Sequence, residues 1–126
     1  MPSFDPFRQS PTALLTTYKR DGTPVATPVT IAVDGDHAYV RTWESAWKAK
    51  RMRNNPDVAL APSTRRGRAT GEALRARSRM LEGDEAKRAA RAIARRQPIL
   101  QGVLVPLTHK LMRYRTLHYE LTTLEG

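Results

Sequence analysis

The stretch Leu14-Leu-Thr-Thr-Tyr-Lys-Arg-Asp-Gly-Thr-Pro-Val-Ala-Thr-Pro-Val29 carries the clearest fold signal in the chain. Its centre, Asp21-Gly22, is a dipeptide that favours the two-residue turn of a β-hairpin. Strand-forming residues lie on both sides of this turn. We therefore predict one strand over Thr12–Arg20 and a returning antiparallel strand over Val25–Val33.

Pro28 lies inside the predicted returning strand. Proline has no N–H to donate to a strand ladder, so it is confined to edge strands, strand starts and bulges. We therefore expect the chain near Pro28 to lie at a sheet edge or to bulge toward a ligand.

The rest of the chain adds short elements on both sides of this hairpin. Before the hairpin we predict a turn or short helix over residues 3–10, and after it a turn at Asp34-Gly35-Asp36 and a strand over His37–Trp43. A basic helix ending at Asn55-Pro56, a strand over Asp57–Ala61, a loop over Pro62–Gly71 and a strand over Glu72–Leu81 follow. The chain then continues with a helix that is capped by Asp84 and ends near Arg96 before Gln97-Pro98, and with a last strand over Arg113–Leu124. Ile99–Leu107 has no clear assignment. Hairpin-linked strands with only two helices predict a mainly β fold, a small barrel.

The segment Arg41–Pro56 is the strongest candidate for a binding site. We expect Ser45 to be the N-cap of its helix, so that Lys48 falls in the first turn. The helix dipole disfavours cations there, whereas free backbone N–H groups and a lysine together suit a bound anion. Lys50, Arg51 and Arg53 follow. The alternative is a solvated basic helix face, which is also how we interpret the arginines of the second helix.

Composition limits the possible functions. The 126 residues suit one domain, and the chain has no cysteine, so thiolate chemistry and disulfides are excluded. The histidines (His37, His109 and His118) lack metal-ligand spacing. No apolar run is long enough to span a bilayer, and the N-terminus lacks signal-peptide features. We therefore expect a cytoplasmic protein without a metal site or a membrane partner.

The net charge of +10 calls for an anionic partner. Nucleic acid, an acidic membrane surface and a phosphorylated ligand are the candidates. The chain contains few aromatic residues, and none alternate with basic residues along a strand as in base-stacking sheets. A phosphate-bearing small molecule is favoured at least as much as a polymer.

Several segments together resemble a known family. They are residues 14–29, Tyr39-Val-Arg-Thr42, Lys48-Ala-Lys-Arg-Met-Arg-Asn-Asn-Pro56, and Val58-Ala-Leu-Ala-Pro62 with the arginine-rich loop. In this order they resemble the flavin/deazaflavin oxidoreductases, split β-barrel proteins related to pyridoxamine 5′-phosphate oxidase. The resemblance covers about residues 12–82 and is strongest to the small deazaflavin-dependent branch.

The resemblance implies a homodimer with the cofactor in a groove between subunits. Lys48 is then the main phosphate ligand, with Lys50 and Arg51 beside it, and Arg41 and Thr42 close the site from the strand. The backbone of Thr27, Pro28, Val29 and Thr30 lies along the ring edge. Relatives often carry a large aromatic residue at the position of Thr30, so the resemblance implies that a threonine here leaves more room or forms a different substrate wall.

The implied function is an oxidoreductase that transfers a hydride between a deazaflavin (coenzyme F-420), or alternatively FMN, and a small conjugated organic substrate. No catalytic acid or base is assigned, because Tyr114 and His118 on one strand face are more typical of barrel packing. Two alternatives stay open. One is a cofactor- or haem-binding protein without turnover, with His109 or His118 as an iron ligand. The other is a nucleic-acid-binding module that uses the arginines of residues 65–79 and 88–96.

Overall fold

The computed structural model describes residues 3–10, 12–43, 46–96 and 116–124. Its elements follow the predicted β-β-β-α-β-β-α-β order. They are the 3-10 helix η1 (Asp5–Phe7), β1 (Thr12–Tyr18), β2 (Pro24–Asp34), β3 (His37–Trp43), α1 (Trp47–Asn54), β4 (Asp57–Pro62), β5 (Leu74–Leu81), α2 (Gly83–Arg96) and β6 (Thr116–Thr123).

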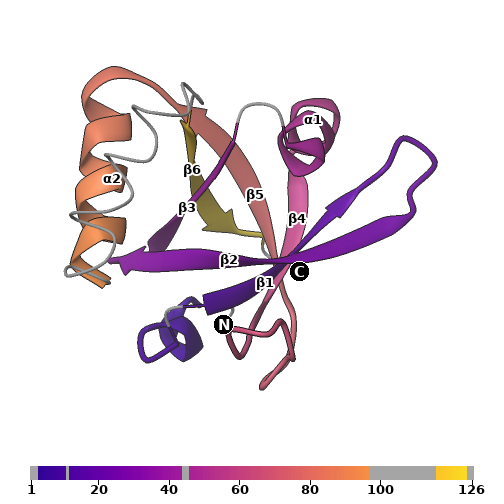
Figure 1. Cartoon of the computed structure of the whole chain (residues 1–126), viewed down its shortest axis with the longest axis horizontal. Helices are drawn as coiled ribbons and strands as arrows, with labels where there is room; N and C mark the ends of the chain where they lie inside the picture. Colours follow the sequence, from indigo (N-terminus) through magenta and orange to yellow (C-terminus); the bar gives the residue numbers. More distant parts are fainter. Residues whose placement is uncertain (1–2, 11, 44–45, 97–115, 125–126) are drawn as a thin grey trace.

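The six strands form a closed antiparallel barrel in the order β1-β2-β3-β6-β5-β4 (Figure 1). This confirms the predicted mainly β barrel with two helices. Its interior contains alternate residues of each strand, among them Leu15, Ile31, Val40, Leu60 and Leu121, which are at most 1% exposed. Full burial of such a side chain contributes about 1.5–3 kcal/mol, so the barrel has a substantial core of its own.

Helix α2 covers one side of the barrel, and α1 lies on the other side near the β1–β2 hairpin (Figure 1). Ala89 and Ile93 are the fully buried residues of α2 and pack against Ala32, Tyr39 and Leu81. α1 is fixed by Ala49 and Met52, which join the main core.

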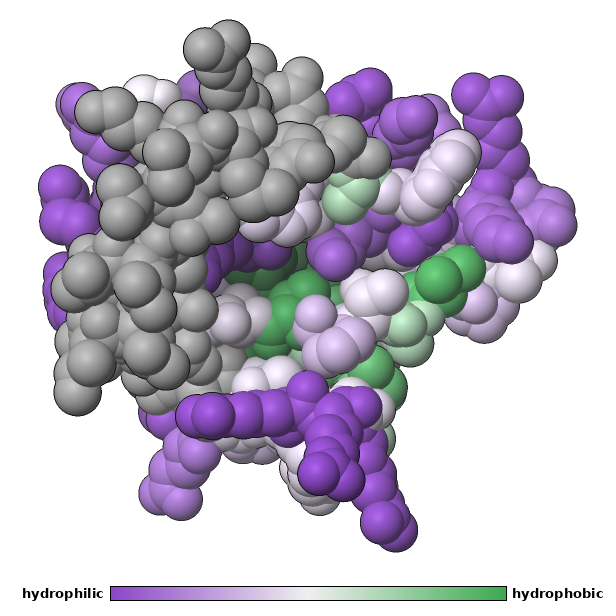
Figure 2. Space-filling view, in the orientation of Figure 1, coloured by the Kyte–Doolittle hydropathy of each residue, from purple (hydrophilic) through white to green (hydrophobic). Residues whose placement is uncertain are grey.

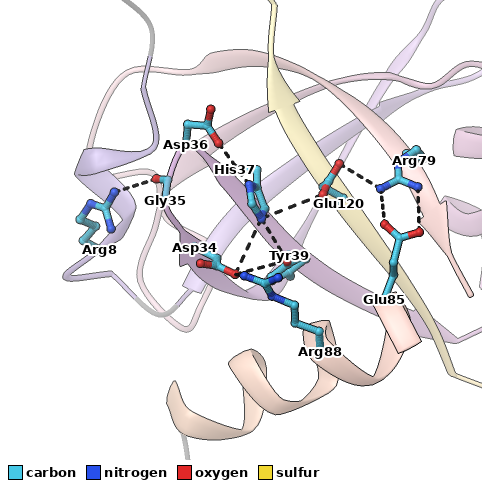
Figure 3. Close-up of polar contacts among 10 residues, drawn as sticks. All are labelled: Arg8, Asp34, Gly35, Asp36, His37, Tyr39, Arg79, Glu85, Arg88 and Glu120. Atoms are coloured by element: carbon cyan, nitrogen blue, oxygen red, sulfur yellow. Dashed lines mark hydrogen bonds and ion pairs between the residues drawn. The ribbon is translucent and has the colours of Figure 1, made fainter. Parts of the chain in front are cut away.

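Polar contacts add to the attachment of α2 (Figure 3). Arg88 donates to Asp34 at 3.1 Å, and Glu85 accepts from Arg79 of β5 at 2.7 Å. Asp34 also lies 3.8 Å from His37 and accepts from the Tyr39 hydroxyl at 3.3 Å. Ion pairs therefore join α2 to the barrel in both directions, from Arg88 of α2 to Asp34 and from Arg79 of β5 to Glu85 of α2.

The β1–β2 hairpin turns at the predicted place but over three residues (20–22) rather than two, because the Gly22 N–H donates to the Lys19 carbonyl at 2.9 Å and Gly22 follows at φ +89°. The Lys19 N–H donates to the Thr23 carbonyl at 2.9 Å and closes the turn. β2 pairs with β1 over Pro24–Thr30 but with β3 only over Ile31–Asp34. Within the described structure, the part of β2 containing Pro28 is therefore bonded on one side only, which agrees with the expected edge position.

Neither helix begins at the N-cap residue that we predicted, Ser45 for the first helix and Asp84 for the second. α1 begins at Trp47 with Ala46 as its N-cap, and no side chain caps it. Ser45 itself lies outside the described residues. α2 begins at Gly83, whose φ is +59°, so Asp84 lies within the first turn. Glycine adopts this left-handed backbone at no steric cost, which lets the helix start there.

Other expectations differ in extent or lie outside the described residues. The strand predicted over Glu72–Leu81 begins at Leu74, and Met80 in it is 45% exposed. The stop at Gln97-Pro98, the segment Ile99–Leu107 and the start of the last strand at Arg113 lie outside the described residues. His109 and Tyr114 do so too. No helix in the described part of the chain is long and apolar enough to cross a membrane.

Candidate cofactor site

The separation of β2 from β3 opens a pocket in the barrel wall. Their ladder ends at Ile31 and Val40, and beyond this pair the strands diverge. The resulting pocket has a volume of about 250 Å³, and we call it the split pocket. It is lined by Pro28, Val29, Thr30, Arg41, Thr42, Trp43, Lys48 and Thr116. Figure 2 shows hydrophobic side chains at the bottom of a central hollow, with hydrophilic side chains above and below.

Two cations face this pocket without a carboxylate partner among the described residues. Burial lowers the pKa of Lys48, and the nearby charge of Arg51 lowers it further. Burial also lowers the pKa of Arg41. In both groups the charged form loses hydration on burial, and no carboxylate among the described residues compensates for it. A bound anion would stabilise both.

Thr42 adds a third polar group to the same wall. The residue is 6% exposed, and its Oγ1 is buried with no hydrogen-bond partner in the described structure. Leaving a buried hydroxyl unsatisfied costs about 1–3 kcal/mol. Because this oxygen is buried, a ligand oxygen in the split pocket could accept from the hydroxyl only after the Thr42 side chain rotates.

The backbone N–H groups at the start of α1 also lack an acceptor among the described side chains. Its N-cap, Ala46, has no side-chain acceptor, and the first turn contains no acidic residue. Lys48 therefore lies beside N–H groups that no described side chain caps, as the sequence predicted. This arrangement favours an anion through the helix dipole as well as through the lysine charge.

The remaining predicted ligands lie elsewhere. Lys50 and Arg51 line a larger groove of about 670 Å³ between α1 and the hairpin, which we call the hairpin groove. Its other lining residues are Lys19, Arg20, Val25, Trp47 and Asn54. Thr27 lines neither cavity, although its Oγ1 is buried and unpartnered within the described structure.

Sequence reasoning missed Thr116 as a wall residue of the split pocket. The β3–β6 register sets Thr116 opposite Trp43 and His118 opposite Arg41. Only this pairing of distant strands could have indicated the position. Among the described residues, no three His, Cys, Asp or Glu side chains gather closely enough to hold a metal ion.

Comparisons with known proteins identify the family and the fold of the chain that forms this pocket. A profile of the family described as pyridoxamine 5′-phosphate oxidase matches residues 3–105. No curated protein matches the chain.

Three solved structures illustrate the similarity. A protein of unknown function from Agrobacterium tumefaciens is 24% identical with a TM-score of 0.70, over 95% of this chain and 51% of its own. The haem storage protein of Vibrio cholerae is 18% identical with a TM-score of 0.68, over 98% and 92%. A candidate pyridoxamine 5′-phosphate oxidase from Listeria innocua is 18% identical with a TM-score of 0.65, over 93% and 86%.

At these low sequence identities, the three structures show that this chain shares their fold and show nothing about its activity or ligand. The chain spans about half the length of the Agrobacterium protein, 51%.

Proposed function

This chain belongs to the pyridoxamine 5′-phosphate oxidase family, and we propose that it is an oxidoreductase using a phosphorylated flavin-type cofactor. A deazaflavin (coenzyme F-420) is our first choice and FMN the second. The observation that carries the proposal is the pair of half-buried cations, Arg41 and Lys48, which line the split pocket and have no carboxylate partner among the described residues.

The chain's own groups fit a phosphate at this place. Lys48 offers an ammonium, Arg41 a planar guanidinium and Thr42 a hydroxyl. Hydrogen bonds between ionised partners are shorter and stronger than neutral ones, and arginine can hold a phosphate with two of them. A bound phosphate would then supply the negative charge and the hydrogen-bond acceptors that the Lys48, Arg41 and Thr42 side chains lack among the described residues.

The size of the split pocket supports a homodimer. Its volume of about 250 Å³ is below the roughly 300–1,000 Å³ typical of small-molecule sites. One subunit can therefore enclose the phosphate end, and we infer that a second copy covers the ring. Light scattering should give a dimer, and a monomer that binds FMN tightly would contradict this inference.

When bound, the cofactor supplies the hydride chemistry, and the protein supplies position and a dry cleft. Pro28, Val29 and Thr30 form the wall beside which the ring would lie, and the small Thr30 leaves room for a substrate. A small conjugated acceptor, such as an enone or a quinone, fits this space. No proton donor is assigned among the described residues.

The phosphate contact can be tested with two ligands that differ only in the phosphate. Lys48→Ala should weaken FMN about tenfold or more, because a charge-assisted hydrogen bond contributes about 1.5–3 kcal/mol. Riboflavin, which lacks the phosphate, should bind the variant and the parent equally. Arg91→Ala, on the exposed face of α2, is the matched charge control. Equal weakening of FMN by both variants would refute the site.

Turnover needs its own measurement. The protein should accelerate oxidation of reduced deazaflavin by an enone or a quinone, followed by the cofactor absorbance. Absence of acceleration with bound cofactor would leave a binding protein without turnover.

Haem is the second candidate, because the similar Vibrio cholerae structure is named for haem storage. In this chain, Arg41 and Lys48 could pair with the propionates, and His118 lies opposite Arg41 in the β3–β6 register. Haem addition should then give a Soret band that His118→Ala shifts or abolishes. An unchanged band would exclude His118 as the iron ligand.

A further inference from the structure

We propose that the hairpin groove is a second ligand site, separate from the split pocket, that binds a planar aromatic anion. The groove lies between α1 and the turn of the β1–β2 hairpin, which extends past the barrel (Figure 1). Its volume of about 670 Å³ falls within the range of roughly 300–1,000 Å³ seen in small-molecule sites.

Trp47 supplies an aromatic surface. It is 71% exposed, the highest value among the large hydrophobic residues of the described structure. Lys50 Nζ lies 4.5 Å from the centroid of its ring, a cation–π contact that restricts the indole. An exposed tryptophan contributes little to the core, whereas its ring can stack on a planar ligand.

Arg51 supplies an oriented anion-binding group. Its Nε donates to Thr17 Oγ1 at 2.6 Å, and Thr17 is only 1% exposed. This bond fixes the plane of the guanidinium, while its terminal nitrogens have no hydrogen-bond acceptor among the described residues. A preorganised guanidinium is suited to grip a carboxylate or a phosphate with two parallel hydrogen bonds.

The charge around the groove favours the same class of ligand. The described lining residues include Lys19, Arg20, Lys50 and Arg51 and no acidic residue. Asp21 lies nearby in the hairpin turn, but its carboxylate accepts from the Thr23 N–H at 2.9 Å. Val25 and Trp47 add apolar surface, so an aromatic ring with one anionic group would satisfy both kinds of lining residue.

The test compares three probes by isothermal titration calorimetry of the full chain. 2-Naphthoate carries both the ring and the charge, 2-naphthalenemethanol only the ring, and cyclohexanecarboxylate only the charge. We expect 2-naphthoate to bind at least tenfold more tightly than either control probe. 2-Naphthyl phosphate then shows which anion Arg51 prefers.

Variants locate the site. Trp47→Ala and Arg51→Ala should each weaken 2-naphthoate about tenfold, whereas Arg53→Ala, an exposed arginine of the same helix outside the groove, should stay within twofold. Because Trp47 is exposed, its variant should fold even if the loss of the Arg51–Thr17 bond prevents folding of Arg51→Ala. An undiminished affinity in Trp47→Ala would overturn the proposal.

Separate readouts keep this proposal independent of the cofactor site. FMN binding should depend on Lys48 and not on Trp47, and saturating FMN should leave the affinity for 2-naphthoate unchanged. Displacement of 2-naphthoate by FMN would place the probe in the split pocket and refute a second site. No binding at millimolar 2-naphthoate, together with a dimer that dissociates on Trp47→Ala, would instead show that another copy of the chain fills the groove.

Discussion

The two helices are both rich in cations, yet their cations have different surroundings. Among the described residues, no cation of α1 pairs with a carboxylate, and Lys48, Lys50 and Arg51 line cavities. α2 contains Asp84 and Glu85 in its first turn, and Arg88 reaches Asp34. The difference shows that the count of basic residues says little about binding. A missing carboxylate beside a desolvated cation is more informative.

The comparison predicts that α2 is a structural helix. Ile93 is fully buried between α2 and the barrel, so Ile93→Ala should lower the free energy of unfolding by about 2–5 kcal/mol. Urea denaturation measures this loss. Arg91→Ala on the exposed face is the control and should change stability by less than about 0.5 kcal/mol. FMN affinity of the folded Ile93→Ala protein should be unchanged, and a large loss of affinity would connect α2 to the site.

The cations of α1 and β3 should instead dominate binding. The double variant Arg41→Ala with Lys48→Ala should weaken FMN about 100-fold, since each residue makes a charge-assisted contact worth about 1.5–3 kcal/mol. The matched pair, Arg88→Ala with Arg91→Ala, removes two positive charges from α2. If both double variants weaken FMN alike, the contrast between the helices is only a matter of net charge.

Lys48 should also reduce stability while no ligand is bound. Its pKa is lowered on folding from 10.5, so the protonated lysine carries a penalty at neutral pH that fades as pH approaches 10.5 and the residue loses its proton. Lys48→Met should therefore stabilise the ligand-free protein by about 0.3–1 kcal/mol at pH 7. Thermal denaturation at pH 7 and near pH 10 tests this sign. Destabilisation at pH 7 would show that Lys48 already has a partner.

The smallest effect concerns a paired cation of α2. The Arg88–Asp34 contact is exposed, with side chains 64% and 35% accessible. Such pairs contribute about 0.2–1 kcal/mol and are screened by salt. Arg88→Ala should lower the melting temperature slightly in low salt and not at all in 1 M NaCl. An equal loss in both conditions would indicate that Arg88 stabilises α2 through packing.

Local sequence features predicted much of this molecule. Asp21-Gly22 determined the hairpin, and Pro28 indicated the free edge of β2, because turn and proline constraints act within a few residues. The position of Lys48 in the first helical turn was predicted from Ser45 as the N-cap, and it holds because the observed N-cap, Ala46, is the next residue. The caps were wrong, because α1 has Ala46 as its N-cap and α2 already begins at Gly83, whose positive φ glycine allows.

Features that depend on distant pairing could not be predicted in this way. Lys50 is two residues from Lys48 and therefore faces another side of α1, as helical geometry requires. Arg51 lies close enough to Lys48 to lower its pKa, but its side chain is bound to Thr17 of β1. Thr116 enters the split pocket only through the β3–β6 register.

The free edge of β2 has a consequence for how the protein behaves at high concentration. An exposed strand edge can recruit a strand of another molecule and begin aggregation. Here Pro24 and Pro28 lie in the part of β2 that has only one ladder neighbour. Because proline offers no N–H and is accepted where that position faces solvent, the edge is a poor template for strand addition. This part of β2 can thus remain without a second ladder partner beside the split pocket and still resist edge-to-edge aggregation.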